Sequence, residues 1–461
     1  MYRTRQYRVK KGHKMYEYCR AATIASVHLY NRANFILRQY ATAVRDFEAM
    51  KPLTANQMGV YHLVQDMTRG TKYSPKGSWL TYGTLDYILK QSGDVAYYGM
   101  HSQANQQTLK LLLRDYKSFF EAIKSYKKNP DAFLGRPRLP RYKKKNSSST
   151  AIYTNQICSI RDERYLKFPG NKVRLNLGNI PPTSKLKEVR IVPEAEWFVI
   201  ETVLEMPDVK AEAFYSLEKP DEELIEELKT FEDISGVRVL GIDPGVDNFC
   251  AVTNNFGVAN LLVRGGNIKS INHYYNKKLA ELKANAMVCN GRYSTRRIER
   301  LHAFRNRKVK DIMHKVSRYI ADYAYENQVK LVVLGHNKLQ KQRIHMGDTN
   351  NQNMVQIPFL QFANMLRYKL EDYGIRLILT EESYTSKADF LAQDKIPVYK
   401  KDDQMAVFSG KRIKRGLYRH KNGQLSNADI NGAANTIRKV FPNVKEWDIG
   451  VVDTPYAVTV A

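Results

Sequence analysis

Cysteine is scarce in this chain, with only four residues among 461. No pair follows the Cys-x-x-Cys spacing, and no histidines stand at zinc-finger distances from the cysteines. This pattern argues against a disulfide framework and predicts a protein of a reducing compartment. We expect all four to be buried small apolar side chains: Cys19, Cys158, Cys250 and Cys289.

Long apolar runs are also missing. A membrane-spanning helix needs about 18 or more consecutive apolar residues, and no such run occurs. The first ten residues are basic and polar, unlike the apolar core of a signal peptide. We therefore predict neither a membrane span nor a membrane partner.

Acidic residues are too few to balance the basic ones. The chain has 74 Lys and Arg against 46 Asp and Glu, which gives a net charge of +28. Such a surplus repels itself, and a polyanion is the usual partner that compensates for it. Nucleic acid is therefore favoured over a membrane surface. The 43% hydrophobic content is enough for folded cores, and the length predicts two or three domains.

The first half of the chain alternates between two kinds of pattern. Residues 1–11 alternate polar and bulky side chains, which predicts a basic strand. Helical periodicity follows over several stretches, and Ser102 is a suitable N-cap for the longest one. The predicted helices cover residues 14–48, 55–68, 80–90 and 103–127. Residues 151–206 consist of short alternating runs separated by Pro, Gly and Asn, which predicts strands.

A basic segment separates these helices from the strands. Six of the ten residues 136–145 are Lys or Arg and two are Pro, so the segment cannot form a regular helix. It is either a solvated linker or an extended segment that follows phosphates. The second interpretation is favoured because Leu139 and Tyr142 interrupt the charges as anchors. Its candidate nucleic-acid contacts are Arg136, Arg138, Arg141, Tyr142 and Lys143.

From residue 236 onward strand and helix patterns alternate, which predicts an α/β domain. Residues 237–249 read as a β-hairpin whose first strand ends in Asp243. Far downstream, Asp429 lies just inside a helix that continues with the small residues Gly432, Ala433 and Ala434. Carboxylates that converge from separate elements bind hard divalent cations. These two acids indicate an RNase H-like nuclease site.

The third acid of such a site is missing from its usual place. The strand 330–335 ends in Gly335, which cannot bind a metal, and His336 suits softer ions than Mg²⁺. Strand ends at one edge of a parallel sheet open into one crevice. Glu381 or Glu382, after the next strand, could therefore reach the same ions. The alternative is a dead site in which both glutamates are structural.

Two other basic stretches are candidates for nucleic-acid contact. One is the predicted helix 294–327, whose charged face alternates with apolar positions at helical spacing. The other is a run inside residues 388–427, which lack periodicity. The candidate residues are Arg297, Arg300, Arg305, Lys308, Lys411, Arg412, Lys414 and Arg415.

A set of motifs in a fixed order resembles one family. It comprises Gly241-Ile-Asp-Pro-Gly-Val, Gly335-His-Asn-Lys-x-x-Lys-Gln, Asn350-Asn-Gln-x-x-x-x-Ile-Pro, Glu381-Glu-Ser-Tyr-Thr-Ser-Lys, Phe408-Ser-Gly-Lys-Arg-Ile-Lys-Arg-Gly-Leu-Tyr and Ala428-Asp-Ile-Asn-Gly-Ala-Ala-Asn. Each motif alone is weak, but the linked set is specific. It resembles TnpB, the OrfB-type proteins of insertion sequences and ancestors of type V CRISPR effectors.

The resemblance implies an RNA-guided DNA endonuclease whose partners are a transposon-derived guide RNA and target double-stranded DNA beside a short flanking motif. It implies two Mg²⁺ ions, with Mn²⁺ as a substitute, and a prokaryotic cytoplasmic protein acting at the nucleoid. The oligomeric state is open, with a monomer favoured. The implied domains are a β-barrel ("wedge") over 1–13 and 131–215, a helical recognition insert over 14–130, a linker over 216–235 and a RuvC-like nuclease domain over 236–461.

The resemblance also bears on the missing acid. Most members carry a glutamate at the end of the middle strand, but some branches and the Fanzor relatives use one further along the chain. Glu382 falls at that alternative position, with Glu381 as the second choice. The implied catalytic and metal-binding set is Asp243, Glu382 and Asp429.

One feature departs from the family. Most members carry a four-cysteine zinc ribbon before the final aspartate, whereas residues 388–427 contain no cysteine. We therefore expect no zinc. This insert must hold its shape by other means, for which the candidates are Tyr399, Phe408, Ile413 and Tyr418.

Three other functions stay open at this point. A nuclease-inactive, RNA-guided DNA-binding repressor would share every binding feature and differ only at the acids. A DNA transposase acting without RNA would use the same fold. A general basic RNA-binding protein would account for the charge alone.

Overall fold

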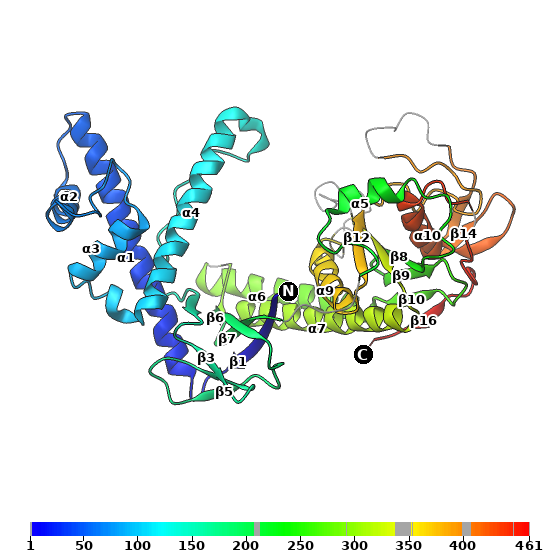
Figure 1. Cartoon of the computed structure of the whole chain (residues 1–461), viewed down its shortest axis with the longest axis horizontal. Helices are drawn as coiled ribbons and strands as arrows, with labels where there is room; N and C mark the ends of the chain where they lie inside the picture. Colours follow the sequence, from blue (N-terminus) through cyan, green and yellow to red (C-terminus); the bar gives the residue numbers. More distant parts are fainter. Residues whose placement is uncertain are drawn as a thin grey trace. The chain divides into compact units, whose positions relative to one another are not determined.

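The computed structural model describes residues 2–206, 213–291, 293–336, 352, 354–398, 407–445 and 447–460. The chain divides into two compact units, Met1–Asp208 and Val209–Ala461 (Figure 1). Across these described ranges, no helix has the length and apolar composition needed to cross a membrane.

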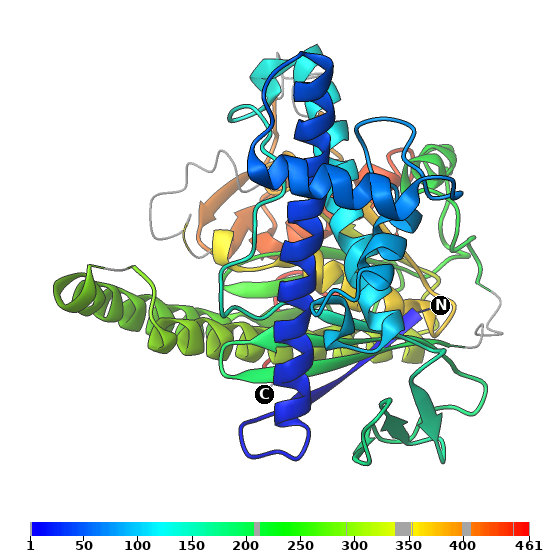
Figure 2. The same ribbon diagram turned by 90° about the vertical axis from the view of Figure 1, so that its left-hand side faces the viewer.

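Helices form the first part of unit one, coloured blue to cyan in Figure 2. They are α1 (Tyr16–Glu48), α2 (Ala55–Thr68), α3 (Tyr82–Gln91) and α4 (Ser102–Lys128). Their apolar faces share one core, in which Leu29, Leu85 and Leu112 are fully buried. Helix α4 begins at Ser102, but its N-cap is His101, whose side chain accepts a hydrogen bond from the Gln103 amide. The predicted Ser102 cap was therefore wrong by one residue.

The strands of unit one form two sheets. The larger sheet, in the order β1-β7-β6-β2, contains β1 (Tyr2–Val9), β2 (Ala151–Thr154), β6 (Lys185–Glu194) and β7 (Trp197–Glu205). The smaller contains β3 (Ser159–Arg161), β4 (Tyr165–Lys167) and β5 (Arg174–Asn176). The first strand pairs with the last along its whole length, so the helices are an insertion within one sheet. Both sheets contribute to one core, while closure into a barrel stays a prediction.

Unit two is built on a six-stranded mixed sheet. Its order is β12-β11-β8-β9-β10-β16. The strands are β8 (Val239–Pro244), β9 (Asn248–Asn254), β10 (Leu261–Arg264), β11 (Leu331–Gly335), β12 (Arg376–Thr380) and β16 (Tyr456–Val458). Strands β8, β9 and β10 form an antiparallel meander, and β11 pairs in parallel with both β8 and β12. This arrangement confirms the predicted α/β class.

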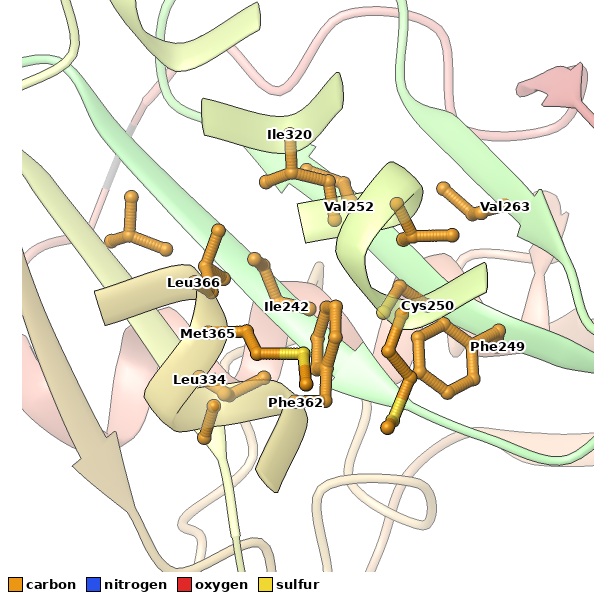
Figure 3. Close-up of a cluster of buried hydrophobic side chains, with 14 of the residues drawn as sticks. Ile242, Phe249, Cys250, Val252, Val263, Ile320, Leu334, Phe362, Met365 and Leu366 are labelled. Atoms are coloured by element: carbon orange, nitrogen blue, oxygen red, sulfur yellow. The ribbon is translucent and has the colours of Figure 1, made fainter. Parts of the chain in front are cut away.

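Helices cover both faces of this sheet. The helices are α5 (Asp221–Leu228), α6 (Gly266–Asn290), α7 (Arg296–Glu326), α9 (Phe359–Glu371) and α10 (Ala428–Val440). Alternate strand residues face opposite sides: Ile242 and Leu334 pack against α7 and α9, whereas Val239 and Val333 pack against α5 and α10. Figure 3 shows the first of these cores, with Phe362 of α9 beside Ile242 and Leu334.

The segment predicted as a linker is part of unit two. Leu224 and Leu228 of α5 are buried in one core with Ile437 and Val440 of α10. Residues 216–235 therefore begin the second unit instead of bridging two domains. The reason is that the acidic helix carries an apolar stripe that needs cover.

The stretch between β12 and α10 ends in a small antiparallel sheet. It contains β13 (Lys411–Lys414), β14 (Leu417–Arg419) and β15 (Leu425–Asn427). Strand β15 runs directly into α10, so this sheet stands at the N-terminus of the helix that carries Asp429.

Candidate active site

The carboxyl end of β8 holds Asp243, and helix α10 lies directly over it. A Cβ atom on Gly241 would lie 2.5 Å from the carbonyl oxygen of Ala433. A Cβ atom on Gly432 would lie 2.6 Å from Asp243 Oδ2. The small residues of α10 therefore let the helix approach the strand closely, as the sequence predicted, and they bring its first turn beside Asp243.

Asp429 is fixed by the cap of its own helix. The Asn427 side chain accepts hydrogen bonds from the amides of Asp429 and Ile430, at 2.9 and 3.3 Å. The Asp429 carboxylate itself accepts from Asn248 Nδ2 at 2.7 Å and from Arg412 at 3.1 Å. Asn248 is the first residue of β9, the second strand of the hairpin that carries Asp243, so one side chain ties Asp429 to that hairpin. Sequence reasoning missed Asn248 because a polar residue at the start of a strand is unremarkable.

Glu382 lies over the end of the middle strand. Strand β11 runs between β8 and β12, and its last residue, Gly335, stands opposite Thr380. A Cβ atom on Gly335 would lie 2.8 Å from Glu382 Oε2 and 3.3 Å from Glu382 Cβ. The glutamate thus fills the space where a side chain of the middle strand would stand.

Glu381 has a different partner. Its carboxylate forms an ion pair with Lys439 of α10 and accepts a hydrogen bond from the Ser383 amide at 2.9 Å. Burial lowers the pKa of Lys439 to about 8. Removing the Glu381 carboxylate would leave a buried ammonium without its counter-charge, which indicates a structural role for this glutamate.

The electrostatics show that the three acids lie close to one another. Burial, and then the carboxylates of Glu382 and Asp429, raise the pKa of Asp243 well above its usual value. The Arg412 guanidinium acts in the opposite direction. A bound cation would stabilise the ionised form of such a carboxylate cluster, because it offsets the repulsion between the negative charges.

The donor set fits a hard divalent cation. All three groups are carboxylates, which Mg²⁺ and Mn²⁺ accept as ligands. Within the described ranges, however, no group of three or more His, Cys, Asp or Glu side chains is spaced so that it could hold a metal ion as it stands. Arg412 pairs with one carboxylate oxygen of Asp429.

His336 was the other candidate at this strand end. Its backbone amide donates to Thr380 O at 2.8 Å and so extends the pairing of β11 with β12. The rest of its motif, from Asn337 to Gln342, lies outside the described residues, as do Asn350 and Asn351.

The basic segment of unit one is held along helix α1. Asn31 of α1 donates to the Lys143 carbonyl at 2.9 Å and accepts from the Lys143 amide at 2.8 Å. Asn34 donates to Pro140 O at 3.2 Å. The Tyr142 ring lies 4.8 Å from the Arg38 guanidinium. These contacts fix the backbone in an extended course, which a solvated linker would not show.

The charged side chains of this segment differ in exposure. Arg136, Arg138 and Arg141 are exposed to solvent, and Tyr142 is nearly half exposed. Lys143 is half-buried over the Tyr30 ring at 4.4 Å, and burial lowers its pKa. The three arginines therefore form an ordered, outward-facing set, whereas Lys143 is partly used in packing.

Helix α7 presents a second basic surface, with one correction. Arg297, Arg300 and Lys308 are exposed. Arg305 is instead half-buried: it donates to Asn272 Oδ1 at 2.9 Å and to the carbonyl of Gln356. We therefore do not expect Arg305 to contact nucleic acid, because its guanidinium connects α7 to α6 and to the segment before α9.

The hairpin β13–β14 brings basic side chains to the acids. Lys411, Arg412, Lys414 and Arg415 are exposed. Arg412 pairs with Asp429, and Arg415 pairs with Asp247, which also binds Lys269. This proximity was not predicted, because nothing in a local pattern places the hairpin over residues so far away in sequence.

Two expectations about apolar residues need correction. Tyr418 is fully buried in the insert and Phe408 is partly buried, but Ile413 is 45% exposed because β13 is an edge strand. Tyr399 lies outside the described residues. All four cysteines are free, and Cys289 near the end of α6 is exposed, not buried as expected.

Two family models match unit two. The OrfB_IS605 model, described as a probable transposase, matches residues 225–340. The Cas12f1-like TNB domain model matches residues 359–436, which include Glu382 and Asp429. The class that the fold and the clustered carboxylates define is an α/β domain. Within it, residues 225–340 resemble the OrfB_IS605 family and residues 359–436 resemble a Cas12f1-like TNB domain, which agrees with the resemblance to OrfB-type proteins that the motifs indicated. No curated protein sequence matches the chain significantly.

Solved structures match over most of the chain at low identity. A Cas12f1–sgRNA–target DNA complex has a TM-score of 0.48 at 13% identity, covering 92% of this chain and 82% of that one. The mini-RNA-guided endonuclease CRISPR-Cas_phi3 has a TM-score of 0.38 at 9% identity, covering 98% and 93%. C2c1 from Alicyclobacillus acidoterrestris with single-guide RNA has 0.34 at 9%, covering 90% and 70%. At these TM-scores the structural likeness is weak, and the resemblance to OrfB-type proteins comes from the family models and the motifs.

Proposed function

We propose that this protein is an RNA-guided DNA endonuclease with a RuvC-like nuclease domain in unit two. Asp243, Glu382 and Asp429 would hold two Mg²⁺ ions, or Mn²⁺ in their place. The strand order of unit two, in which the parallel strands β11 and β12 extend an antiparallel meander on the β8 side, supports an RNase H-like fold. The family models over residues 225–340 and 359–436 support the transposon context.

One observation carries the proposal. The Glu382 carboxylate comes within 2.8 Å of the place where a Gly335 side chain would begin. Glu382 follows strand β12, but its carboxylate lies at the end of the neighbouring strand β11. This position supports a rearranged active site over an inactive one.

The chain's own residues would prepare the site for the reaction. Asp243, Glu382 and Asp429 would hold the divalent ions. Asn248 would orient the Asp429 carboxylate through its 2.7 Å hydrogen bond. Bound divalent ions supply an activated water and stabilise the departing 3′ oxygen.

Nucleic-acid binding would use the basic surfaces of each unit. Base pairing with a guide RNA would read the target DNA, and the protein would read duplex shape and a short flanking motif. Arg136, Arg138 and Arg141 are candidates for backbone contact, because phosphate contacts need exposed cations in fixed positions.

The proposal is tested with the purified protein expressed together with its genomic 3′ flank. We expect a co-purifying RNA from that flank, and metal-dependent cleavage of DNA that matches it. Asp243→Ala, Asp429→Ala and Glu382→Ala should each abolish cleavage and leave RNA binding intact. An RNA-free preparation that cuts or joins DNA ends would identify a transposase instead.

A nuclease-inactive, RNA-guided repressor is the second candidate. Two observations favour it: the acids are not arranged as a closed metal site among the described residues, and Arg412 pairs with Asp429. Such a protein would bind guide RNA and target DNA with the same specificity and leave the DNA intact at every Mg²⁺ or Mn²⁺ concentration tried.

A further inference from the structure

A chain of three polar side chains is buried inside the insert between β12 and α10. His420 Nδ1 lies 2.5 Å from Asp389 Oδ1, and His420 Nε2 lies 2.7 Å from Ser426 Oγ. Asp389 and Ser426 have no exposed surface, and His420 is 3% exposed. Because a carboxylate can only accept, the Nδ1 atom of His420 carries the shared proton.

Asp389 also organises the backbone around it. Its Oδ1 atom accepts from the amides of Leu391 and Ala392 at 3.0 and 3.1 Å, and its Oδ2 atom accepts from Lys421 at 2.7 Å. Burial acts to raise the pKa of Asp389, but the hydrogen bonds from His420 and the backbone outweigh it and lower the pKa. The carboxylate is therefore ionised and fully engaged in the folded state.

The order acid, imidazole, hydroxyl is that of a hydrolase triad, but the surroundings exclude that role. A nucleophilic serine must reach a substrate carbonyl, and Ser426 is fully buried within the strand β15. The insert also packs tightly around the acid: a Cβ atom on Gly410 would lie 2.8 Å from Asp389 Oδ2. A structural role remains.

The buried chain joins the two segments that carry the candidate ligands. Asp389 lies in the loop that leaves Glu382, and Thr385 in that loop donates to the Glu382 carbonyl at 2.9 Å. Ser426 directly precedes Asn427, the N-cap of the helix with Asp429. His420 is therefore the link between the Glu382 loop and the start of α10.

Side chains of α10 strengthen the same connection. Asn431 donates to Ala388 O at 2.9 Å and accepts from the Phe390 amide at 3.2 Å. Asn435 donates to the carbonyls of Thr385 and Ala388 at 2.9 and 2.7 Å. The loop is thus held against the helix from one side and against the β-sheet of the insert, through His420, from the other.

We propose that Asp389, His420 and Ser426 form a metal-free centre that positions Glu382 and Asp429 relative to each other. The three are positioning residues, since each acts through the backbone that carries a candidate ligand. The metal-binding part of this inference rests on the proposed function, whereas the structural part does not.

The test compares His420→Ala, Ser426→Ala and His420→Asn in the full chain by hydrogen exchange and by Mn²⁺ titration calorimetry. His420→Ala should accelerate exchange at the amides of Leu391, Ala392 and Lys421, and also at those of Asp429 and Ile430. Its Mn²⁺ affinity should fall by about 10- to 100-fold, the usual cost of losing a group that supports metal ligands. Ser426→Ala should show a smaller change confined to the α10 side.

His420→Asn is the rescue variant, because its amide can still donate to Asp389, and it should recover exchange protection at Leu391 and Ala392. His273→Ala, an exposed histidine of α6, is the matched control and should change neither readout. A zinc-selective chelator should leave the wild type unaltered.

Unchanged exchange at Asp429 and Ile430 in His420→Ala would overturn the proposal. Global unfolding would show as fast exchange in α7 as well. If the wild type does not bind Mn²⁺, the proposed function fails, and the exchange result still decides the structural claim.

Discussion

At the scale of single residues, the site depends on a space that Gly335 leaves open. Any side chain there would begin 2.8 Å from the Glu382 carboxylate, which is closer than two such atoms approach. A side chain at position 335 and the Glu382 carboxylate in its present position are therefore mutually exclusive.

Gly335→Ala tests this exclusion. The added Cβ atom would meet the carboxylate at the far end of the flexible Glu382 side chain. We therefore expect this carboxylate to move while the fold stays intact. We expect the unfolding free energy to stay within about 1 kcal/mol of the wild type, and cleavage to fall at least about tenfold. Gly266→Ala is the control, because a Cβ atom there meets nothing within 4 Å. Undiminished cleavage by Gly335→Ala would mean that the position of Glu382 is unimportant.

The residue scale also shows what the sequence could not decide. Asp243 and Asp429 stood out because an acid at a strand end and an acid in the first turn of a small-residue helix are unusual. Glu381 and Glu382 are adjacent, and only the resemblance to the family favoured Glu382 over Glu381. The structure distinguishes them physically, because Lys439 on α10 forms an ion pair with Glu381.

At the scale of elements, the packing of α9 on α7 buries an amine. Lys369 Nζ donates to His314 O and to Ser317 Oγ, both at 2.6 Å, and the side chain is 4% exposed. Burial lowers the pKa of Lys369 to about 8 from 10.5. The packing of α9 on α7 therefore favours the neutral form of the Lys369 amine over the charged form.

This burial predicts a pH dependence of stability. Between pH 8 and 10.5 the unfolded chain binds more protons at Lys369 than the folded one, so the free energy of unfolding rises with pH across that window. Lys369→Met should reduce this rise in chemical denaturation, while Lys330→Met, at an exposed site, should not. An equal slope in the wild type and Lys369→Met would contradict the assignment.

The extended segment on α1 gives a prediction about binding. Arg138→Glu with Arg141→Glu should weaken RNA binding and lower the slope of log affinity against log salt by about two, one for each lost phosphate contact. Arg20→Glu with Arg45→Glu, two exposed arginines of helix α1, is the charge-matched control. If the double variant leaves this slope unchanged, residues 136–145 act as a linker and do not contact phosphates.

Element prediction succeeded where the periodicity was strong. Helix α2 has the predicted limits, and its Thr54–Gln57 capping box explains why its start was readable. Helix α6 was missed because only a few of its side chains, such as Ile268, are buried, so no apolar stripe marks it. Strands β13 to β15 were missed because they are short and carry exposed basic side chains. The contact between Asp389 and His420 was missed as well, because it joins residues far apart in sequence.

At the scale of the whole molecule, three carboxylates come together in a strongly basic chain. The net charge of +28 suits a polyanion partner. Against this background Asp243, Glu382 and Asp429 form a local acidic cluster bordered by Arg412. Under the proposed function, this cluster would bind divalent cations.

The most direct test of that claim is the calorimetric titration of Mn²⁺ into the wild type, Glu382→Gln and Glu381→Gln. The account predicts that Glu382→Gln loses Mn²⁺ affinity by at least about tenfold. Glu381→Gln should bind Mn²⁺ like the wild type and be less stable, because Lys439 loses its counter-charge. Wild-type affinity in Glu382→Gln, or its loss in Glu381→Gln alone, would contradict the central claim.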